Sequence, residues 1–266
     1  MELARYLDRI GFDAPIATDL ATLKALHRAH LLAIPYENLD VQMGRRRTTS
    51  PAEAYEKIVG EKRGGWCYEM NGTFGWALKE AGFKVTRLAG AGSEPHSHLV
   101  LSVDLEGETW IADVGFADGP LEPFRLTPGP FEQRGFAFSI DDHGDGRWRL
   151  NNHPFGAAKG YDCGGPDEPA MADRCQWLQT APESVFVQNA VIFHHDADGG
   201  FSSLIGKVLR RFTAEAPQPK RIIENADDYV AALKDVFDLD FPAAASVWPK
   251  IEARHEELFG AAAGSA

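Results

Sequence analysis

Cys67 is the first residue of the sequence whose surroundings could support chemistry. It follows the double glycine of RGGWCYEMN and stands where a helix reaching Gly82 is predicted to begin. The unpaired N–H groups of a helix N-terminus carry partial positive charge, which stabilises a thiolate. A lone cysteine is otherwise a small core residue. A nucleophile at this position therefore also needs a base and a group that orients the base.

His98 and Asp113 could supply both partners, because they fall close together in a predicted hairpin. The segment HSHLVLSVDLEGETWIADVGF reads as two strands joined by a turn at residues 106–107. In this register Val100 faces Asp113, and His98 is the diagonal neighbour of Asp113 on the same face. His96 shares that face but lies one step further away. The register therefore selects His98, although a slip by one residue would overturn the choice.

The composition is that of an acidic globular protein. The chain has 266 residues, of which 44% are hydrophobic and 25% charged, and its formal net charge is −12. An acidic surface repels nucleic acid and anionic membranes, so neither is predicted as a partner. The sequence holds no apolar run of about 18 residues, and its N-terminus lacks the apolar core of a signal peptide. Three sparse cysteines, at positions 67, 163 and 175, fit a reducing cytoplasm.

The hydrophobic pattern divides the chain into three parts that should pack as one unit. The first part is helical, and Ser50, Pro51 and Glu53 predict a capping box at the start of one helix. The middle part holds short runs parted by turns, the last of them RCQWLQ, which predict an antiparallel sheet or small barrel. The final part mixes strand and helix patterns.

The chain resembles the arylamine N-acetyltransferase family through most of its length. The matching segments are AIPYENLDV at 33–41, RGGWCYEMN at 63–71, HLVLSV at 98–103, DVGF at 113–116 and PESVFVQN at 182–189. The resemblance implies an α+β fold in three domains. These are an N-terminal helical bundle with the catalytic Cys over 1–83, a central antiparallel β-barrel with the His and Asp over 84–195, and an interdomain segment with an α/β lid over 196–266.

The resemblance also implies a reaction. The catalytic triad maps onto Cys67, His98 and Asp113, an arrangement shared with cysteine-protease-like and transglutaminase-like folds. Acetyl-CoA would be the cosubstrate and would acetylate the cysteine. The acetyl group would then pass to an arylamine, arylhydroxylamine or hydrazine in a ping-pong mechanism. No metal is expected, since HHDADGG at 194–200 starts like a calcium loop but has Lys207 where the loop needs a glutamate.

Further residues are assigned to the site by the same resemblance. Three aromatic residues are expected to wall the cleft: Tyr36, Phe116 and Phe186. Two small residues are expected to let pantetheine and its phosphates approach the backbone: Ser97 and Gly115. Apart from the resemblance, three polar residues flank Cys67 and are expected from their position to hold the Gly-Gly turn and the helix start: Arg63, Glu69 and Asn71.

Two departures from the family pattern concern the cleft. The segment between Cys67 and His98 is shorter than usual and lies near the cleft mouth, which leaves the size of the acceptor open. Tyr36 stands where the family usually has Phe. It keeps the aromatic wall but adds a hydroxyl that needs a partner when buried.

Three other functions stay open at this point. One is an amide synthase of natural-product assembly, which takes a long acyl chain from a carrier protein. Another is an amide hydrolase or transglutaminase-like enzyme with the same triad. The third is a binding module that has kept the fold without its activity. The sequence leaves the physiological amine, the preferred acyl chain and the oligomeric state undetermined.

Overall fold

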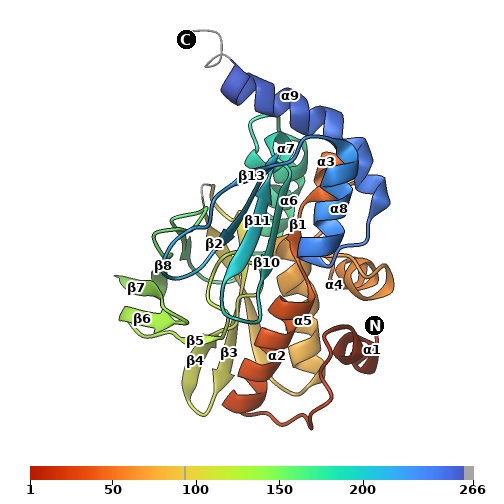
Figure 1. The fold of residues 1–266 in the computed structure, drawn as a ribbon. Coiled ribbons are helices and arrows are strands. Elements are labelled where there is room, and N and C mark those ends of the chain that lie inside the picture. Colours follow the sequence, from red (N-terminus) through yellow and green to blue (C-terminus); the bar gives the residue numbers. More distant parts are fainter. Residues whose placement is uncertain (93, 261–266) are drawn as a thin grey trace.

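Helices form the first third of the computed structural model, which describes residues 1–92 and 94–260 (Figure 1). The two longest, α2 (Leu20–Ala33) and α5 (Cys67–Glu80), pack against each other. The shorter elements are α1 (Leu3–Arg9), α3 (Leu39–Gln42), α4 (Pro51–Tyr55) and the π-helical turn η1 (Glu56–Gly60). Apolar residues of these helices share one core with strand residues such as Leu101 and Val103. Helix α5 is therefore held on several sides, which fixes the position of its first residue, Cys67.

The predicted capping box at the start of α4 is only partly right. Ser50 is the N-cap and Pro51 the first helical residue, as expected, but the Ser50 side chain makes no capping hydrogen bond. Glu53 instead accepts a hydrogen bond of 2.8 Å from the Thr48 hydroxyl, whose oxygen also accepts from the Ser50 N–H at 3.1 Å. Thr48 thus accepts from the Ser50 N–H, a role that the capping box assigned to Glu53.

An antiparallel sheet of eight strands follows the helices. Its strands lie in the order β5 (Phe124–Arg125), β4 (Glu108–Ile111), β3 (His98–Leu105), β2 (Lys84–Ala91), β9 (Gly160–Cys163), β8 (Arg147–Asn151), β7 (Phe136–Gly144) and β6 (Gly129–Gln133). The middle of the chain therefore forms the antiparallel sheet that its pattern predicts, and α5 packs on β2 and β3.

The sheet is a half-barrel, so the expected β-barrel does not close. In the described part of the chain, β5 and β6 are its two edges and do not pair with each other. Side chains join the edges instead: the rings of Phe124 and Phe131 stack at 5.1 Å. The Gln133 side chain also accepts from the Glu122 N–H and donates to its carbonyl, both at 2.9 Å. Side chains, and not a backbone ladder, therefore connect β5 and β6.

The hairpin β3–β4 has the predicted register. Val103 pairs with Trp110 and Ser102 with Ile111, and the Ala112 N–H donates to the Leu101 carbonyl at 2.9 Å. Strand β4 ends at Ile111, so Asp113 lies just beyond the ladder. The confirmed register brings Asp113 to the end of β3 at which His98 stands.

The segment RCQWLQ is helical, which corrects its prediction as a strand. It lies within α6 (Glu168–Thr180), where the Asp167 side chain caps the first turn by accepting from the Ala170 N–H. The buried apolar residues Met171, Cys175 and Leu178 follow a helical repeat that begins before the quoted segment. A six-residue window is too short to separate this repeat from strand alternation.

A second antiparallel sheet of five strands completes the fold. Its order is β1 (Tyr36–Glu37), β10 (Val191–His195), β11 (Phe201–Ile205), β12 (Val208–Phe212) and β13 (Arg221–Ile222). The hairpin β10–β11 spans residue 195, where the predicted barrel and lid regions meet. Three C-terminal helices share a core with this sheet: α8 (Ala226–Phe237), the 3-10 helix η2 (Pro242–Val247) and α9 (Trp248–Phe259). Strand β1 ties the sheet to the segment before Cys67.

Candidate active site

Cys67 is the first residue of α5, and a tight backbone contact fixes the turn before it. Strand β1 runs beside this turn, where the Glu37 N–H donates to the Gly65 carbonyl at 2.9 Å. A Cβ atom on Gly64 would lie 2.1 Å from the Pro35 carbonyl oxygen, so only glycine allows this approach. The thiol is buried, and its Sγ lies 3.7 Å from the Ser97 carbonyl oxygen. The nucleophile candidate thus sits on rigid backbone.

A buried ion network holds the turn and the helix start. Glu69 accepts from the Trp66 N–H at 3.2 Å and from Lys57 Nζ at 2.7 Å. Lys57 also lies 3.3 Å from Glu37, which accepts from Arg63 at 2.7 Å. Because buried charges are stable only when paired and hydrogen-bonded, these contacts depend on one another. Arg63 and Glu69 therefore support the Gly-Gly turn, as the sequence indicates.

His98 and Asp113 form a buried pair beside the thiol. His98 Nε2 lies 2.7 Å from Asp113 Oδ2, and both side chains are buried. Burial alone would lower the pKa of His98. The charge and hydrogen bond of Asp113, reinforced by the Cys67 side chain, outweigh it and raise the pKa to about 10. For Asp113, burial raises the pKa, but the imidazolium and its hydrogen bonds bring the pKa below its usual value.

Asn71 connects the cysteine helix to Asp113, a role that the sequence analysis missed. Its Nδ2 donates to Asp113 Oδ1 at 2.7 Å and to the Leu99 carbonyl, while its Oδ1 accepts from the Val114 N–H at 3.0 Å. Asn71 lies one helical turn after Cys67, so both face the same side of α5. That spacing was the available signal, but its partner could not be read from the sequence.

His96 is placed away from the pair. Its backbone lies in the left-handed region, with φ of 56°, and its imidazole is 40% exposed. The imidazole Nε2 lies 3.6 Å from Asp167, and the His96 carbonyl accepts from the Tyr68 hydroxyl at 2.7 Å. The left-handed residue turns the chain between His96 and His98. Of the two histidines, only His98 therefore meets Asp113.

One pocket of about 610 Å³ opens onto the thiol, and its lining is mostly apolar. Seven of the predicted site residues line it: Tyr36, Cys67, Ser97, His98, Gly115, Phe116 and Phe186. Asp113 is not among the lining residues and lies behind the His98 ring. The structure adds Tyr161, whose ring centroid lies 4.7 Å from that of His98. The pocket has the size expected of a site for a small organic ligand.

Two small residues of the pocket have structural duties. A Cβ atom on Gly115 would lie 2.6 Å from Asn71 Nδ2 and 2.9 Å from Cys67 Cα, so glycine is needed for the packing of DVGF on α5. The Ser97 hydroxyl donates to the Glu94 carbonyl at 2.6 Å and accepts from the Gly92 N–H at 3.0 Å. Both residues line the pocket, but these contacts stabilise the protein itself and involve no ligand.

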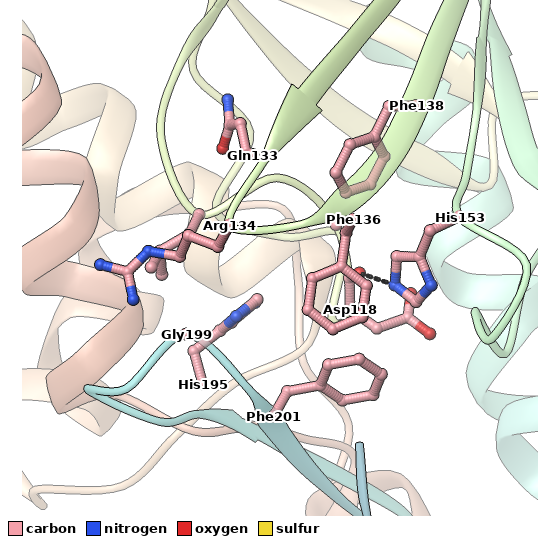
Figure 2. Close-up of a pocket in the computed structure, with 11 residues that line it drawn as sticks. Asp118, Gln133, Arg134, Phe136, Phe138, His153, His195, Gly199 and Phe201 are labelled. Carbon is pink, nitrogen blue, oxygen red and sulfur yellow. Dashed lines mark hydrogen bonds between the residues drawn. The ribbon is translucent and has the colours of Figure 1, made fainter. Parts of the chain in front are cut away.

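A second cavity lies beside the first but has room for about 10 Å³ only (Figure 2). Figure 2 shows the His153 ring bonded to Asp118, whose carbonyl lies 2.9 Å from Nε2. Asp118 also accepts from the Ala157 N–H at 2.6 Å, and Ala157 lines the thiol pocket. The cavity is too small for an organic substrate. Its residues instead hold the loop that forms one wall of the larger pocket.

Two further properties of the described residues bear on other classes of function. None of the helices in residues 1–92 and 94–260 is both long enough and apolar enough to cross a membrane. Within the same residues, no three His, Cys, Asp or Glu side chains gather in a way that could hold a metal ion.

Similarity to known proteins identifies the class to which this fold and its thiol pocket belong. A family model described as N-acetyltransferase matches residues 19–246. An arylamine N-acetyltransferase of Mycolicibacterium smegmatis is 42% identical over 159 residues, which span 54% of this chain and 58% of that protein. The liver isozyme of Gallus gallus is 29% identical over 90% of this chain and 96% of its own.

Solved structures agree with the sequence matches. The arylamine N-acetyltransferase of Mycobacterium marinum in complex with CoA superposes with a TM-score of 0.82 at 31% identity, covering 96% of this chain and 99% of that one. That of M. smegmatis gives a TM-score of 0.86 at 29% identity, covering 94% and 97%. The chain belongs to the arylamine N-acetyltransferase family and is an enzyme of this acyltransferase type.

Proposed function

We propose that the protein transfers an acetyl group from acetyl-CoA to an arylamine, arylhydroxylamine or hydrazine, with acetylated Cys67 as the intermediate. The observation that carries this proposal is the His98–Asp113 contact of 2.7 Å at the base of the thiol pocket. Because Nε2 bonds to Asp113, Nδ1 is the ring nitrogen left to serve Cys67. Cys67, His98 and Asp113 would then act in sequence as nucleophile, base and orienting carboxylate.

Cys67 starts the reaction as a thiolate paired with protonated His98. Sγ attacks the acetyl carbonyl, and the C–S bond to CoA breaks. His98 gives its proton to the leaving CoA sulfur, while Asp113 stabilises the charged ring and holds its tautomer. Neutral His98 then takes a proton from the amine as the amine nitrogen attacks the acetyl-cysteine. Sγ leaves, and the thiolate–imidazolium pair is restored.

The lining of the pocket suits both substrates. Phe116 contacts the His98 ring edge-on at 5.7 Å, and Phe186 lies edge-on to Trp66 at 5.3 Å. Such an apolar wall keeps water from the acetyl-cysteine and offers a surface to an aromatic acceptor. The exposed Lys159 lines the same pocket and offers positive charge to the phosphates of CoA. The M. marinum relative, solved with CoA, supports this choice of donor.

Intact mass spectrometry tests the proposal. Mixing with acetyl-CoA should add one acetyl group to the protein, and a panel of arylamines and hydrazines should remove it as the N-acetyl product. The Cys67→Ala variant is the control and should gain no mass.

Labelling by a long-chain acyl carrier protein but not by acetyl-CoA would identify an amide synthase instead. Labelling by a peptide or glutamine substrate alone would identify a hydrolase or transglutaminase-like enzyme. The three sparse cysteines support the further proposal of a cytoplasmic location.

A further inference from the structure

Tyr36 lies on a strand that runs beside the turn leading to the nucleophile, Cys67. Tyr36 forms a parallel bridge with Gly65, two residues before Cys67. Its ring is buried and lies edge-on to Phe193, with 6.4 Å between centroids and 82° between planes. Tyr36 and Cys67 both line the thiol pocket. The backbone bridge and the ring contact therefore hold the phenol on the cysteine side of the cavity.

Among the described residues that line the pocket, three carry a hydroxyl: Tyr36, Ser97 and Tyr161. The Ser97 hydroxyl is engaged by the Glu94 carbonyl and the Gly92 N–H. The Tyr161 ring packs on the ring of His98, with 4.7 Å between centroids, so its hydroxyl belongs to the side of the base. Of these three hydroxyls, that of Tyr36 is therefore the one on the cysteine side of the pocket.

Two properties of the phenol suit it to donate a hydrogen bond to a negative charge. Burial first, and then the charge of Cys67, raise the pKa of Tyr36 well above its usual value, so the phenol keeps its proton. The backbone of Cys67 acts in the opposite direction and lowers this pKa. The Cys67 N–H is at the first position of α5, where no intrahelical partner exists. Both donors therefore belong to residues that line the thiol pocket.

We propose that the Tyr36 hydroxyl is a catalytic hydrogen-bond donor that, with the Cys67 N–H, stabilises the oxyanion formed at the acyl carbonyl. The inference rests on the proposed acyl transfer and adds a residue to it. When the Sγ–C bond forms, the carbonyl π electrons move onto oxygen. The oxyanion returns those electrons as the bond to the leaving sulfur breaks. Its charge exists only around the transition state, so a donor aimed at it lowers the barrier.

The Tyr36→Phe variant tests the inference because it removes one oxygen atom and keeps the ring. Two reactions of Cys67 are compared in single turnovers. Acylation by p-nitrophenyl acetate passes through an oxyanion. Alkylation by iodoacetamide is a displacement at a tetrahedral carbon and forms none, so it reports the thiolate alone. Tyr36→Phe should slow acylation by about 10²-fold, the usual effect of losing one oxyanion donor, and should leave alkylation unchanged.

Tyr229→Phe is the matched control. It also removes a buried hydroxyl, but in the core of the second sheet and its helices. Both of its reactions should match the unmodified protein. Equal losses of acylation and alkylation in Tyr36→Phe would mean that the hydroxyl acts on the thiolate, which overturns the inference. Unchanged acylation would overturn it as well. If acetyl-CoA fails to acetylate the unmodified protein while p-nitrophenyl acetate succeeds, the proposed function fails and the role of Tyr36 is still decided.

Discussion

Asp113 Oδ1 accepts hydrogen bonds from Asn71 Nδ2 at 2.7 Å and from the Gly115 N–H at 2.9 Å, which leaves Oδ2 for His98. The carboxylate is thus oriented from two sides before it meets the imidazole. Asn71 belongs to the helix of Cys67, so the helix that positions the nucleophile also aims the group that orients the base. Such shared support is a means of keeping a site within the narrow geometry that catalysis needs.

Removing the Asn71 side chain should weaken both the fold and the reaction. In Asn71→Ala the buried Val114 N–H loses its partner, which costs about 1–3 kcal/mol, and Asp113 Oδ1 keeps only the Gly115 N–H. We expect the free energy of unfolding to fall by that order and the acetylation of Cys67 to slow. Urea unfolding and single-turnover acetylation measure the two effects. Unchanged acetylation in a destabilised protein would show that Asn71 only supports the fold.

Cys67 should be the reactive thiol of the three. Burial raises the pKa of Cys175 to about 12 and moves that of Cys163 in the same direction, so both stay protonated at neutral pH. Cys67 instead faces the His98 ring. Limiting iodoacetamide at pH 7 should modify Cys67 first and abolish transfer, which peptide mass mapping measures. Preferential labelling of Cys163 or Cys175 with activity retained would contradict this assignment.

The two neighbouring histidines should differ sharply when replaced by alanine. His98→Ala removes the proton carrier beside Cys67, and we expect acetylation to slow by about 10²- to 10⁴-fold, the usual contribution of general acid–base catalysis. His96→Ala loses only a half-exposed ring near Asp167 and should change the rate little. Stopped-flow acetylation at neutral pH compares them. A dead His96→Ala variant beside an active His98→Ala variant would refute the assignment of the base.

The pH dependence of acetylation should have its alkaline limit near the pKa of His98, about 10. The protonated ring persists below this pKa, so the rate should fall as pH rises through it. Asp113→Asn removes the charge that holds the proton on the ring, and its alkaline limit should move to lower pH. Acetylation rates measured from pH 6 to 10.5 test this, because that range includes the raised pKa of His98, about 10. Identical limits in both proteins would show that His98 does not set the profile.

The free energy of unfolding should fall in mild acid because of buried neutral histidines. Burial lowers the pKa of His27 to about 4 and that of His195 to about 3, below the value of about 6.5 expected in the unfolded chain. Below about pH 6.5 these histidines bind protons in the unfolded chain but stay neutral in the folded protein. Stability should therefore be full above about pH 6.5 and decline by about 1.4 kcal/mol per histidine for each further pH unit.

Urea unfolding between pH 7.5 and 5 measures this decline, and His195→Asn, which cannot titrate, provides the comparison. Its stability should depend less steeply on pH than that of the unmodified protein. An equally steep decline would mean that other groups are responsible.

The sequence by itself determined the local features of this protein. The helix beginning at Cys67 follows from a glycine turn and an apolar repeat, both contained in one segment. The register of β3 and β4 follows from a short turn, because a hairpin pairs residues that are close along the chain. This register was enough to choose His98 over His96. The family motifs added the aromatic walls of the pocket.

Only the tertiary structure decided the features that join distant segments. Asn71 contacts Asp113 across 42 residues, and no local sequence pattern around either residue predicts this contact. The half-barrel stays open because the short β5 meets β6 through Phe and Gln side chains and not through a backbone ladder. Tyr36 lies beside the turn that precedes the nucleophile because β1 pairs both with Gly65 and with β10. Local propensity sets each element, whereas side-chain packing between elements sets their distances, and packing depends on all partners at once.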